Sequence, residues 1–285
     1  ILKRNKYDAI HCHNGLESGI CNLAAYLAGV KIRISHAHTA NNIFSSKIII
    51  ANLYRKILQH LMNSVTNVKI GCSEEAFIKL FGSRYLSKKS SFIIPNAIDL
   101  KKFVRKENCN KNDNIKIVHI GRYCDNKNQI MLIELLPYIL EKFPNVLLQL
   151  MGFGEEYKDK IRKRAIQLGV ESKVQFLSSD SNRIDVLNGA KLFVFPSKTE
   201  GFGIALLEAQ AMEVPCIVSD TVPKIVDCGL CKFIPLSENR EKWVKEIEKV
   251  IRGESRLKLN RKKLNLFDLQ NYVRMMQLIY NGTKI

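Results

Sequence analysis

The stretch FVFPSKTEGFGIALLEAQAMEVPCIVSD, residues 193–220, decides the fold of this chain. It begins within an apolar run, residues 192–195, whose length and bulk are typical of a strand that is buried on both faces. A short loop follows, and from Gly203 onward apolar side chains recur at helical spacing. A second apolar run, residues 216–218, comes next. Strand, loop, helix and strand in this order predict one βαβ unit with parallel strands.

Acidic side chains and glycines follow the first strand of this unit, which is where ligands bind in parallel α/β sheets. Glu200 directly precedes Gly-Phe-Gly, and Glu208 follows eight residues later, inside the expected helix. Glycines let a phosphate approach the backbone, and free N–H groups at a helix N-terminus attract anions. Two acids beside such a site suit a ligand with both phosphate and sugar hydroxyls. The alternative is that Glu200 caps the helix and Glu208 is a solvated helix residue.

The same alternation of strands and helices extends over the whole chain of 285 residues. Strands are expected at residues 7–13, 31–38, 68–72, 91–94, 115–120, 146–151, 174–177, 192–195, 216–218 and 232–234. Helices are expected at residues 15–28, 45–62, 74–81, 129–142, 155–168, 183–190, 203–212, 238–252 and 266–280, with Ser73 as an N-cap. This order predicts parallel sheets with right-handed crossovers.

A polar, weakly periodic segment, residues 96–114, divides the pattern in two. We therefore expect a first domain over residues 1–108 and a second over residues 109–285, with a terminal helix that packs back on the first. The first residues already read as the approach to a strand, so the first domain is expected to be incomplete at its start. Ligands favour the region between two such domains.

The net charge of +18, from 45 basic and 27 acidic residues, suits nucleic acid, anionic lipid or phosphorylated substrates. Few aromatic residues lie between the basic ones, which disfavours a nucleic-acid platform and favours an anionic membrane together with diphosphate ligands. No apolar run is long enough to span a membrane. Of the eight cysteines only Cys228 and Cys231 form a C-x-x-C, and no second pair completes a zinc site, which favours reduced thiols in the cytoplasm.

Further polar residues follow other expected strands. Arg122 and Lys127 bracket a helix start after the strand 115–120, and two such cations suit a diphosphate, although a basic chain also carries surface cations by chance. Gly152 and Gly154 form a G-x-G after the next strand, which by itself is often only a turn. Histidines end two strands of the first domain: His36 and His38, and before them His11 and His13.

The segment FPSKTEGFGIALLEAQA resembles the signature of retaining glycosyltransferases of the GT-B fold, family four. GRYCDNKN and MGFGE are similar to further motifs of the family, and SHAHT to a motif of its polysaccharide-type members. IPNAID is similar to the family's inter-domain segment, with Ala97 in place of the usual glycine. The resemblance implies an α/β fold of two Rossmann-like domains that face each other across a cleft.

The resemblance also implies site roles. Arg122 and Lys127 would bind the donor diphosphate together with the backbone amides of Phe202, Gly203 and Ile204. Glu208 would bind the ribose, and Gly152 and Gly154 would line the nucleotide pocket. Glu200 would position the transferred sugar, and His38, with His36 as the alternative, would contact it.

The sequence therefore predicts a retaining transfer of a sugar from a nucleotide diphosphate, most simply UDP, to a lipid-linked or cell-surface polysaccharide. No cofactor and no metal are expected, because the chain contains no D-x-D motif to hold a divalent ion. The enzyme would lie in the cytoplasm, peripheral to the inner face of the plasma membrane, without binding nucleic acid. Two alternatives remain open: a sugar-nucleotide epimerase of the same fold, and a non-catalytic subunit that binds nucleotide sugar.

Overall fold

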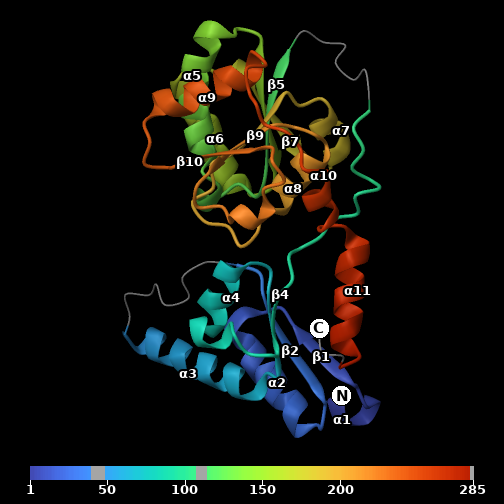
Figure 1. The fold of residues 1–285 in the computed structure, drawn as a ribbon. Helices are drawn as coiled ribbons and strands as arrows, with labels where there is room; N and C mark the ends of the chain where they lie inside the picture. Colours follow the sequence, from blue (N-terminus) through green and yellow to red (C-terminus); the bar gives the residue numbers. More distant parts are fainter. Residues whose placement is uncertain (40–48, 107–113, 283–285) are drawn as a thin grey trace. The chain divides into compact units, whose positions relative to one another are not determined.

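The computed structural model describes residues 1–39, 49–106 and 114–282 (Figure 1). The chain forms two compact units. Unit 1 comprises Ile1–Ala97, Glu200–Phe202 and Phe267–Ile285, and unit 2 comprises Ile98–Thr199 and Gly203–Leu266. The predicted boundary at residue 108 lies outside the described residues.

Unit 1 contains a parallel sheet in the order β1-β2-β3-β4. Its strands are β1 (Ala9–Cys12), β2 (Ile32–Ala37), β3 (Val68–Gly71) and β4 (Ser91–Ile93), and its helices are α1 (Leu2–Asn5), α2 (Ser18–Leu27), α3 (Ile49–Val65), α4 (Glu74–Phe81) and α11 (Leu269–Tyr280). Ser73 caps α4 as expected, because its hydroxyl accepts a hydrogen bond from the Ala76 N–H at 3.1 Å.

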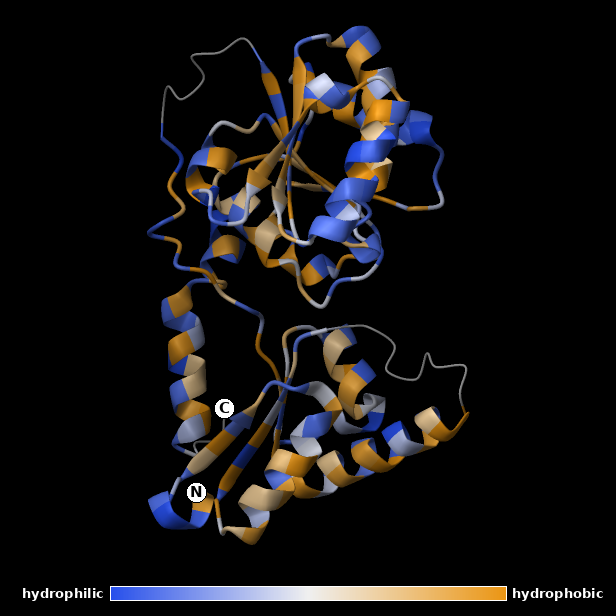
Figure 2. Ribbon diagram, turned by 180° about the vertical axis from the view of Figure 1, so that it is seen from behind, coloured by the Kyte–Doolittle hydropathy of each residue, from blue (hydrophilic) through white to orange (hydrophobic). Residues whose placement is uncertain are grey.

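Helix α11 completes the core of unit 1, although it comes from the far end of the sequence. Figures 1 and 2 show α2 and α3 on one side of the sheet and α11 on the other. Met276 and Ile279 of α11 pack with Ile34 of β2, Ile70 of β3 and Ile94, which directly follows β4, and all five are nearly or fully buried. The burial of these side chains supplies the hydrophobic stabilisation that holds α11 on the sheet.

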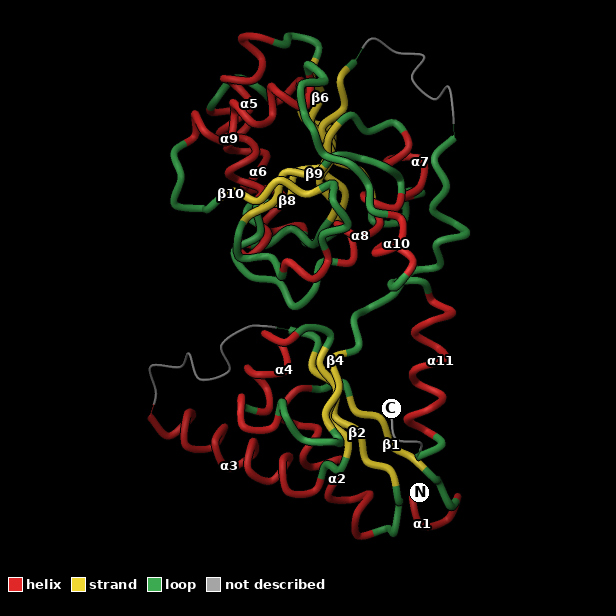
Figure 3. Tube along the Cα trace, in the orientation of Figure 1, coloured by secondary structure: helices red, strands yellow, loops and turns green. Residues whose placement is uncertain are grey.

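Unit 2 contains a parallel sheet in the order β10-β9-β8-β5-β6-β7 (Figure 3). Its strands are β5 (Ile115–Ile120), β6 (Val146–Gly152), β7 (Val174–Ser178), β8 (Leu192–Phe195), β9 (Cys216–Ser219) and β10 (Cys231–Ile234). Its helices are α5 (Gln129–Lys142), α6 (Glu155–Gln167), α7 (Arg183–Asn188), α8 (Ile204–Ala211), α9 (Arg240–Ile251) and α10 (Arg261–Asn265). The predicted fold class, α/β with two parallel sheets, is confirmed.

The order of this second sheet fixes where a ligand can bind. The chain places β6 and β7 on one side of β5, then returns to place β8, β9 and β10 on the other side. This is the Rossmann strand order. All strands are parallel, but the direction in which successive strands are added to the sheet reverses between β5 and β8. In such sheets ligands bind beyond the carboxyl ends of the strands at the reversal, so the loops after β5, β6 and β8 form the expected binding region.

Several helix bounds differ from the prediction: the segment expected as one helix at residues 15–28 is a 3-10 turn, Gly15–Glu17, followed by α2, and the helix expected to end at residue 62 continues to Val65. Two further differences have a clear cause. The helix expected at residues 203–212 begins at Ile204, because Gly203 has a φ of 98° and is the N-cap. The pattern expected as one helix at residues 266–280 begins at Leu269 and is preceded by the separate short helix α10, whose sequence RKKLN has too few apolar residues to reveal it. Residues 45–48 of another expected helix lie outside the described residues.

Candidate functional site

The loop from β8 to α8 is held against the turn that follows β5. The amide Nδ2 of Asn126 donates to the Thr199 carbonyl at 2.7 Å, and the backbone N–H of Lys198 donates to the Asn126 carbonyl at 2.7 Å. Asn128 Nδ2 donates to the Pro196 carbonyl at 3.2 Å. Because these bonds join the exits of two neighbouring strands, the backbone at the sheet reversal has a defined geometry.

Three helices of unit 2 begin beside this reversal without a side-chain cap. They are α5, α6 and α8, which begin after β5, β6 and β8, and their N-cap residues Asn128, Gly154 and Gly203 all have positive φ angles. By contrast, α7, α9 and α10 are capped by asparagine side chains. The first N–H groups of a helix have no partner within the helix. Three uncapped N-termini beside one another therefore form an environment that favours an anion.

The two cations predicted to bind the diphosphate, Arg122 and Lys127, follow the end of β5. Arg122 is exposed and Lys127 is half-buried. The Lys127 ammonium lies 4.9 Å from the centre of the Phe195 ring, and its side chain passes over Gly121, where an added Cβ would lie 3.4 Å from Cε. The packed stem directs one cation over the end of β5, next to the three helix N-termini.

A buried pair of side chains beneath this exit fixes the backbone of Arg122. Gln129 Nε2 donates to the Arg122 carbonyl at 2.9 Å, and it also lies 3.4 Å from His119 Nε2. The other ring nitrogen of His119 lies 2.9 Å from the Val194 carbonyl, to which it donates. Burial lowers the pKa of His119 to about 4, with a smaller contribution from the positive charge of Lys127 and an opposing one from the hydrogen bond to Val194, so this imidazole is neutral at pH 7.

Gly152 and Gly154 pack the exit of β6 against the exit of β5. A Cβ on Gly152 would lie 2.1 Å from the carbonyl oxygen of Gly121, and one on Gly154 would lie 2.7 Å from that of Tyr123. Both contacts are with backbone, which a neighbouring side chain could not relieve by moving. These glycines therefore have a steric role in bringing the two strand exits together, whatever ligand they also meet.

Glu208 lies on α8 with only 6% of its surface exposed, so the alternative of a solvated helix residue is wrong. Its carboxylate pairs with the Arg183 guanidinium at 3.1 Å. Burial raises the pKa of Glu208, and Arg183 opposes that rise. A buried carboxylate held by one arginine still has acceptor positions for sugar hydroxyls. The sequence analysis did not identify Arg183. Its position could have indicated a role, because it is a cation in the first turn of the helix that follows β7.

Glu200 is not the cap of α8, since Gly203 holds that position. Glu200 is half-buried and belongs, with Gly201 and Phe202, to unit 1. A Cβ on Gly201 would lie 2.0 Å from the carbonyl oxygen of His38, so only glycine fits there without a shift of the backbone. The buried Phe202 ring meets Phe267 edge to face at 5.7 Å. Within unit 1, the backbone that directly follows Glu200 therefore packs against the backbone of His38, so the two predicted catalytic residues lie on neighbouring segments.

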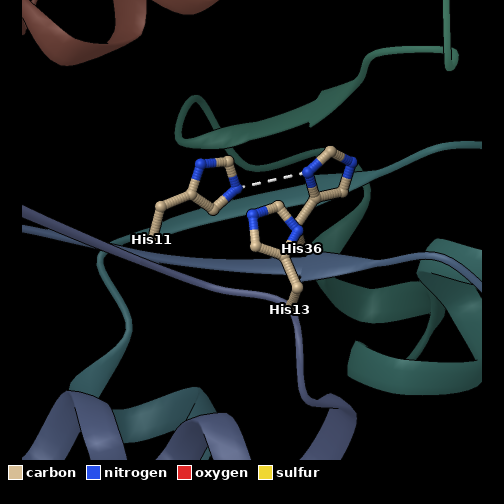
Figure 4. Close-up of side chains that lie close together, drawn as sticks. All are labelled: His11, His13 and His36. Carbon is tan, nitrogen blue, oxygen red and sulfur yellow. Dashed lines mark hydrogen bonds between the residues drawn. The ribbon is translucent and has the colours of Figure 1, made fainter.

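The four predicted histidines of unit 1 form one cluster, at the carboxyl ends of β1 and β2. His13 Nδ1 lies 2.7 Å from His38 Nε2, and His11 Nε2 lies 3.2 Å from His36 Nδ1 (Figure 4). Burial lowers the pKa of each ring, to about 4 for His11 and about 2 for His36, and neighbouring rings add to the effect for His11, His36 and His38. A hydrogen bond of His38 with the side chain of Asn96 opposes this effect on the His38 pKa. All four rings are therefore neutral at pH 7.

The sequence and the structure are similar to those of known proteins. The family described as Glycosyl transferases group 1 matches residues 101–265. The Bacillus subtilis protein named as glycosyltransferase EpsF is 30% identical over 260 residues, which are 87% of this chain and 67% of that protein. The Escherichia coli UDP-Gal:alpha-D-GlcNAc-diphosphoundecaprenol alpha-1,3-galactosyltransferase is 28% identical over 233 residues, 77% of this chain and 59% of its own length.

Among solved structures, Anabaena Alr3699/HepE in complex with UDP-glucose superposes with a TM-score of 0.79 at 20% identity, over 97% of this chain and 78% of that one. At this identity the likeness establishes the fold, which is that of the GT-B enzymes. The roles of the individual site residues remain predictions.

Proposed function

The chain belongs to the group 1 glycosyltransferases, and on this premise we propose that it is a retaining enzyme that transfers a sugar from UDP to a lipid-linked or cell-surface polysaccharide acceptor.

The observation that carries the proposal is the grouping of three uncapped helix N-termini at the reversal of the second sheet. The N–H groups at the starts of α5, α6 and α8 and the side chains of Arg122 and Lys127 supply donors and positive charge at one edge of the sheet. Charge-assisted hydrogen bonds of this kind are about twice as strong as neutral ones. A diphosphate is the ligand whose charge and acceptor oxygens this edge matches.

The nucleoside would extend from the diphosphate toward Glu208 and the exit of β6. The Glu208 carboxylate, fixed by Arg183, would accept hydrogen bonds from the ribose hydroxyls. The backbone at Gly152 and Gly154 would line the pocket for the base. UDP is proposed because the related E. coli enzyme uses UDP-Gal by its name and HepE binds UDP-glucose.

In the transfer itself, the bond between the anomeric carbon and the diphosphate oxygen breaks. The acceptor hydroxyl forms the new bond on the same face, and its proton passes to a donor phosphate oxygen. Arg122, Lys127 and the amides of Phe202, Gly203 and Ile204 would stabilise the charge that develops on the leaving diphosphate.

Glu200 would position the sugar and stabilise the positive charge at the anomeric carbon, and His38 would hold a sugar hydroxyl. His38 suits this role because it is neutral at pH 7 and can both donate and accept. No step in this scheme requires a divalent ion.

The acceptor is proposed to be lipid-linked because the E. coli relative acts on a diphosphoundecaprenol-linked sugar by its name. Within the described residues, none of the helices could cross a membrane. Helix α3 nevertheless exposes a row of large apolar side chains, each more than half exposed: Ile49, Ile50, Leu53, Tyr54 and Ile57. With the exposed Lys56 and a net charge of +18, this face suits the surface of an anionic membrane, on its cytoplasmic side.

Two experiments test the proposal. A thermal-shift screen across nucleotide diphosphate sugars should show the largest stabilisation with one UDP-sugar, because a ligand that binds only the folded state raises its stability. That donor should then be transferred to a polyprenyl-diphosphate-linked sugar, with NMR of the product showing a retained anomeric configuration. An inverted product would refute the retaining mechanism. A rearranged donor without transfer would indicate the epimerase, and binding without turnover the non-catalytic subunit.

A further inference from the structure

The histidine cluster of unit 1 has a geometry that sugar binding does not require. One ring nitrogen from each of His11, His13 and His36 lies within 4.8 Å of the others. These rings come from the ends of β1 and β2, and Figure 4 shows them gathered with the His11 and His36 nitrogens facing each other. Of the described residues, these three make the one group of at least three histidine, cysteine or acidic side chains with such spacing.

The spacing fits a transition-metal ion. Zn²⁺ holds histidine nitrogens at about 2.0–2.1 Å in a tetrahedron, which places neighbouring ligand nitrogens about 3.3 Å apart. His11 Nε2 and His36 Nδ1 lie 3.2 Å apart. His13 is exposed, so its ring can turn toward the ion without disturbing the core.

The proton positions also fit. His11 Nδ1 lies 2.7 Å from the Tyr280 hydroxyl, and His13 Nδ1 lies 2.7 Å from His38 Nε2. If each Nδ1 donates there, both Nε2 atoms carry lone pairs. Metal-bound histidines commonly donate their second N–H in this way, which fixes the ring and raises its basicity. Only one proton can lie between His11 Nε2 and His36 Nδ1, and a metal ion would take the place of that proton.

The second nitrogen of His36, Nε2, is buried and has no hydrogen-bond partner among the described residues. His36 can therefore carry its proton on Nε2 and present Nδ1 to an ion without breaking another hydrogen bond.

We propose that His11, His13 and His36 bind one Zn²⁺ or a similar ion of the imidazole-preferring metals, with a fourth position left for water. Three imidazoles do not suit Mg²⁺, Mn²⁺ or Ca²⁺, which prefer oxygen ligands. The ion would join β1 to β2 and, through Tyr280, to α11. It would also fix the His13 ring against His38. Any effect of the ion on catalysis rests on the proposed function, whereas the binding of the metal ion does not.

Calorimetric titration of ZnCl₂ into protein stripped with EDTA, with no nucleotide present, tests the site. We expect saturation at one ion per chain. His13→Gln should weaken binding at least tenfold, whereas His60→Gln, at a histidine outside the cluster, should leave it unchanged. His13 is exposed, so the variant should fold, and circular dichroism verifies that it does.

Tyr280→Phe provides a second variant that keeps all three ligands. Loss of an outer-shell partner typically lowers metal affinity about 10- to 100-fold. Equal Zn²⁺ affinity in the native protein and in His13→Gln would overturn the proposal and indicate adventitious binding, for example to thiols. Absence of saturable binding would overturn it as well. Neither result bears on donor binding, which the thermal-shift screen measures separately.

Discussion

Replacement of Lys127 by methionine tests the diphosphate site most directly. Methionine keeps an unbranched stem over Gly121 and against Phe195 but removes the charge. A hydrogen bond to a charged group contributes about 1.5–3 kcal/mol, which corresponds to a loss of donor affinity of about 10- to 150-fold. The lost interaction with the Phe195 ring should lower the free energy of unfolding by less than about 1 kcal/mol.

The assay for Lys127→Met is calorimetric titration with UDP, followed by steady-state transfer at saturating acceptor. Because the ammonium would also stabilise the leaving diphosphate, kcat should fall together with UDP affinity. Lys198→Met is the matched control, since Lys198 pairs with Asp125 at 2.8 Å on the surface and has no proposed contact with the donor. Unchanged UDP affinity in a folded Lys127→Met protein would refute the assignment of Lys127.

Further predictions concern the chemistry and the packing. Glu200→Gln should lower kcat at least 100-fold with little change in UDP affinity, and normal turnover would remove Glu200 from the mechanism. Mg²⁺ and Mn²⁺ should not stimulate transfer by EDTA-treated protein, and stimulation of several-fold would show a metal-assisted mechanism. Gly152→Ala should lower the melting temperature and UDP affinity, since its Cβ would meet backbone at 2.1 Å. Gly189→Ala should do neither, because φ is −85°, the close neighbour is the flexible end of Lys116, and the Asp185 carbonyl oxygen lies at an ordinary contact distance of 3.8 Å. The buried His119 has its pKa lowered from 6.5 to about 4, so its stabilising effect is complete above pH 6.5 and is lost as the pH falls toward 4. At pH 5 this loss is about 2 kcal/mol, and urea unfolding of His119→Gln should show a correspondingly weaker pH dependence.

Local patterns were sufficient for the elements that form the donor side of unit 2. The bounds of β5, α5 and β8 agree with the sequence prediction, because each is a single apolar or amphipathic run that ends at a proline, a glycine or a charged residue. The βαβ unit of β8, α8 and β9 is confirmed by the parallel pairing of Phe193 with Cys216. These features depend on neighbours within a few residues, which is what a sequence pattern records.

Contacts between distant residues could not be predicted in this way. The pairing of Arg183 with Glu208 depends on how α7 and α8 pack, and the burial of Glu208 follows from that packing. Likewise, the sequence places histidines at the ends of two strands, but the contact of His11 with Tyr280 depends on a residue 269 positions further along the chain. Helix ends, burial and ion pairs are tertiary properties, and the sequence contains them only through the complete fold.

The distribution of helix caps links the stability of unit 2 to its proposed function. A side-chain cap stabilises a helix by about 1 kcal/mol, and Asn182, Asn239 and Asn260 supply one to α7, α9 and α10. The three helices at the sheet reversal lack this stabilisation, and they begin at residues whose positive φ turns the chain sharply into the helix. A diphosphate that accepts hydrogen bonds from these N–H groups would take the place of the missing side-chain caps. Donor binding should therefore stabilise unit 2 at the N-termini of these three helices.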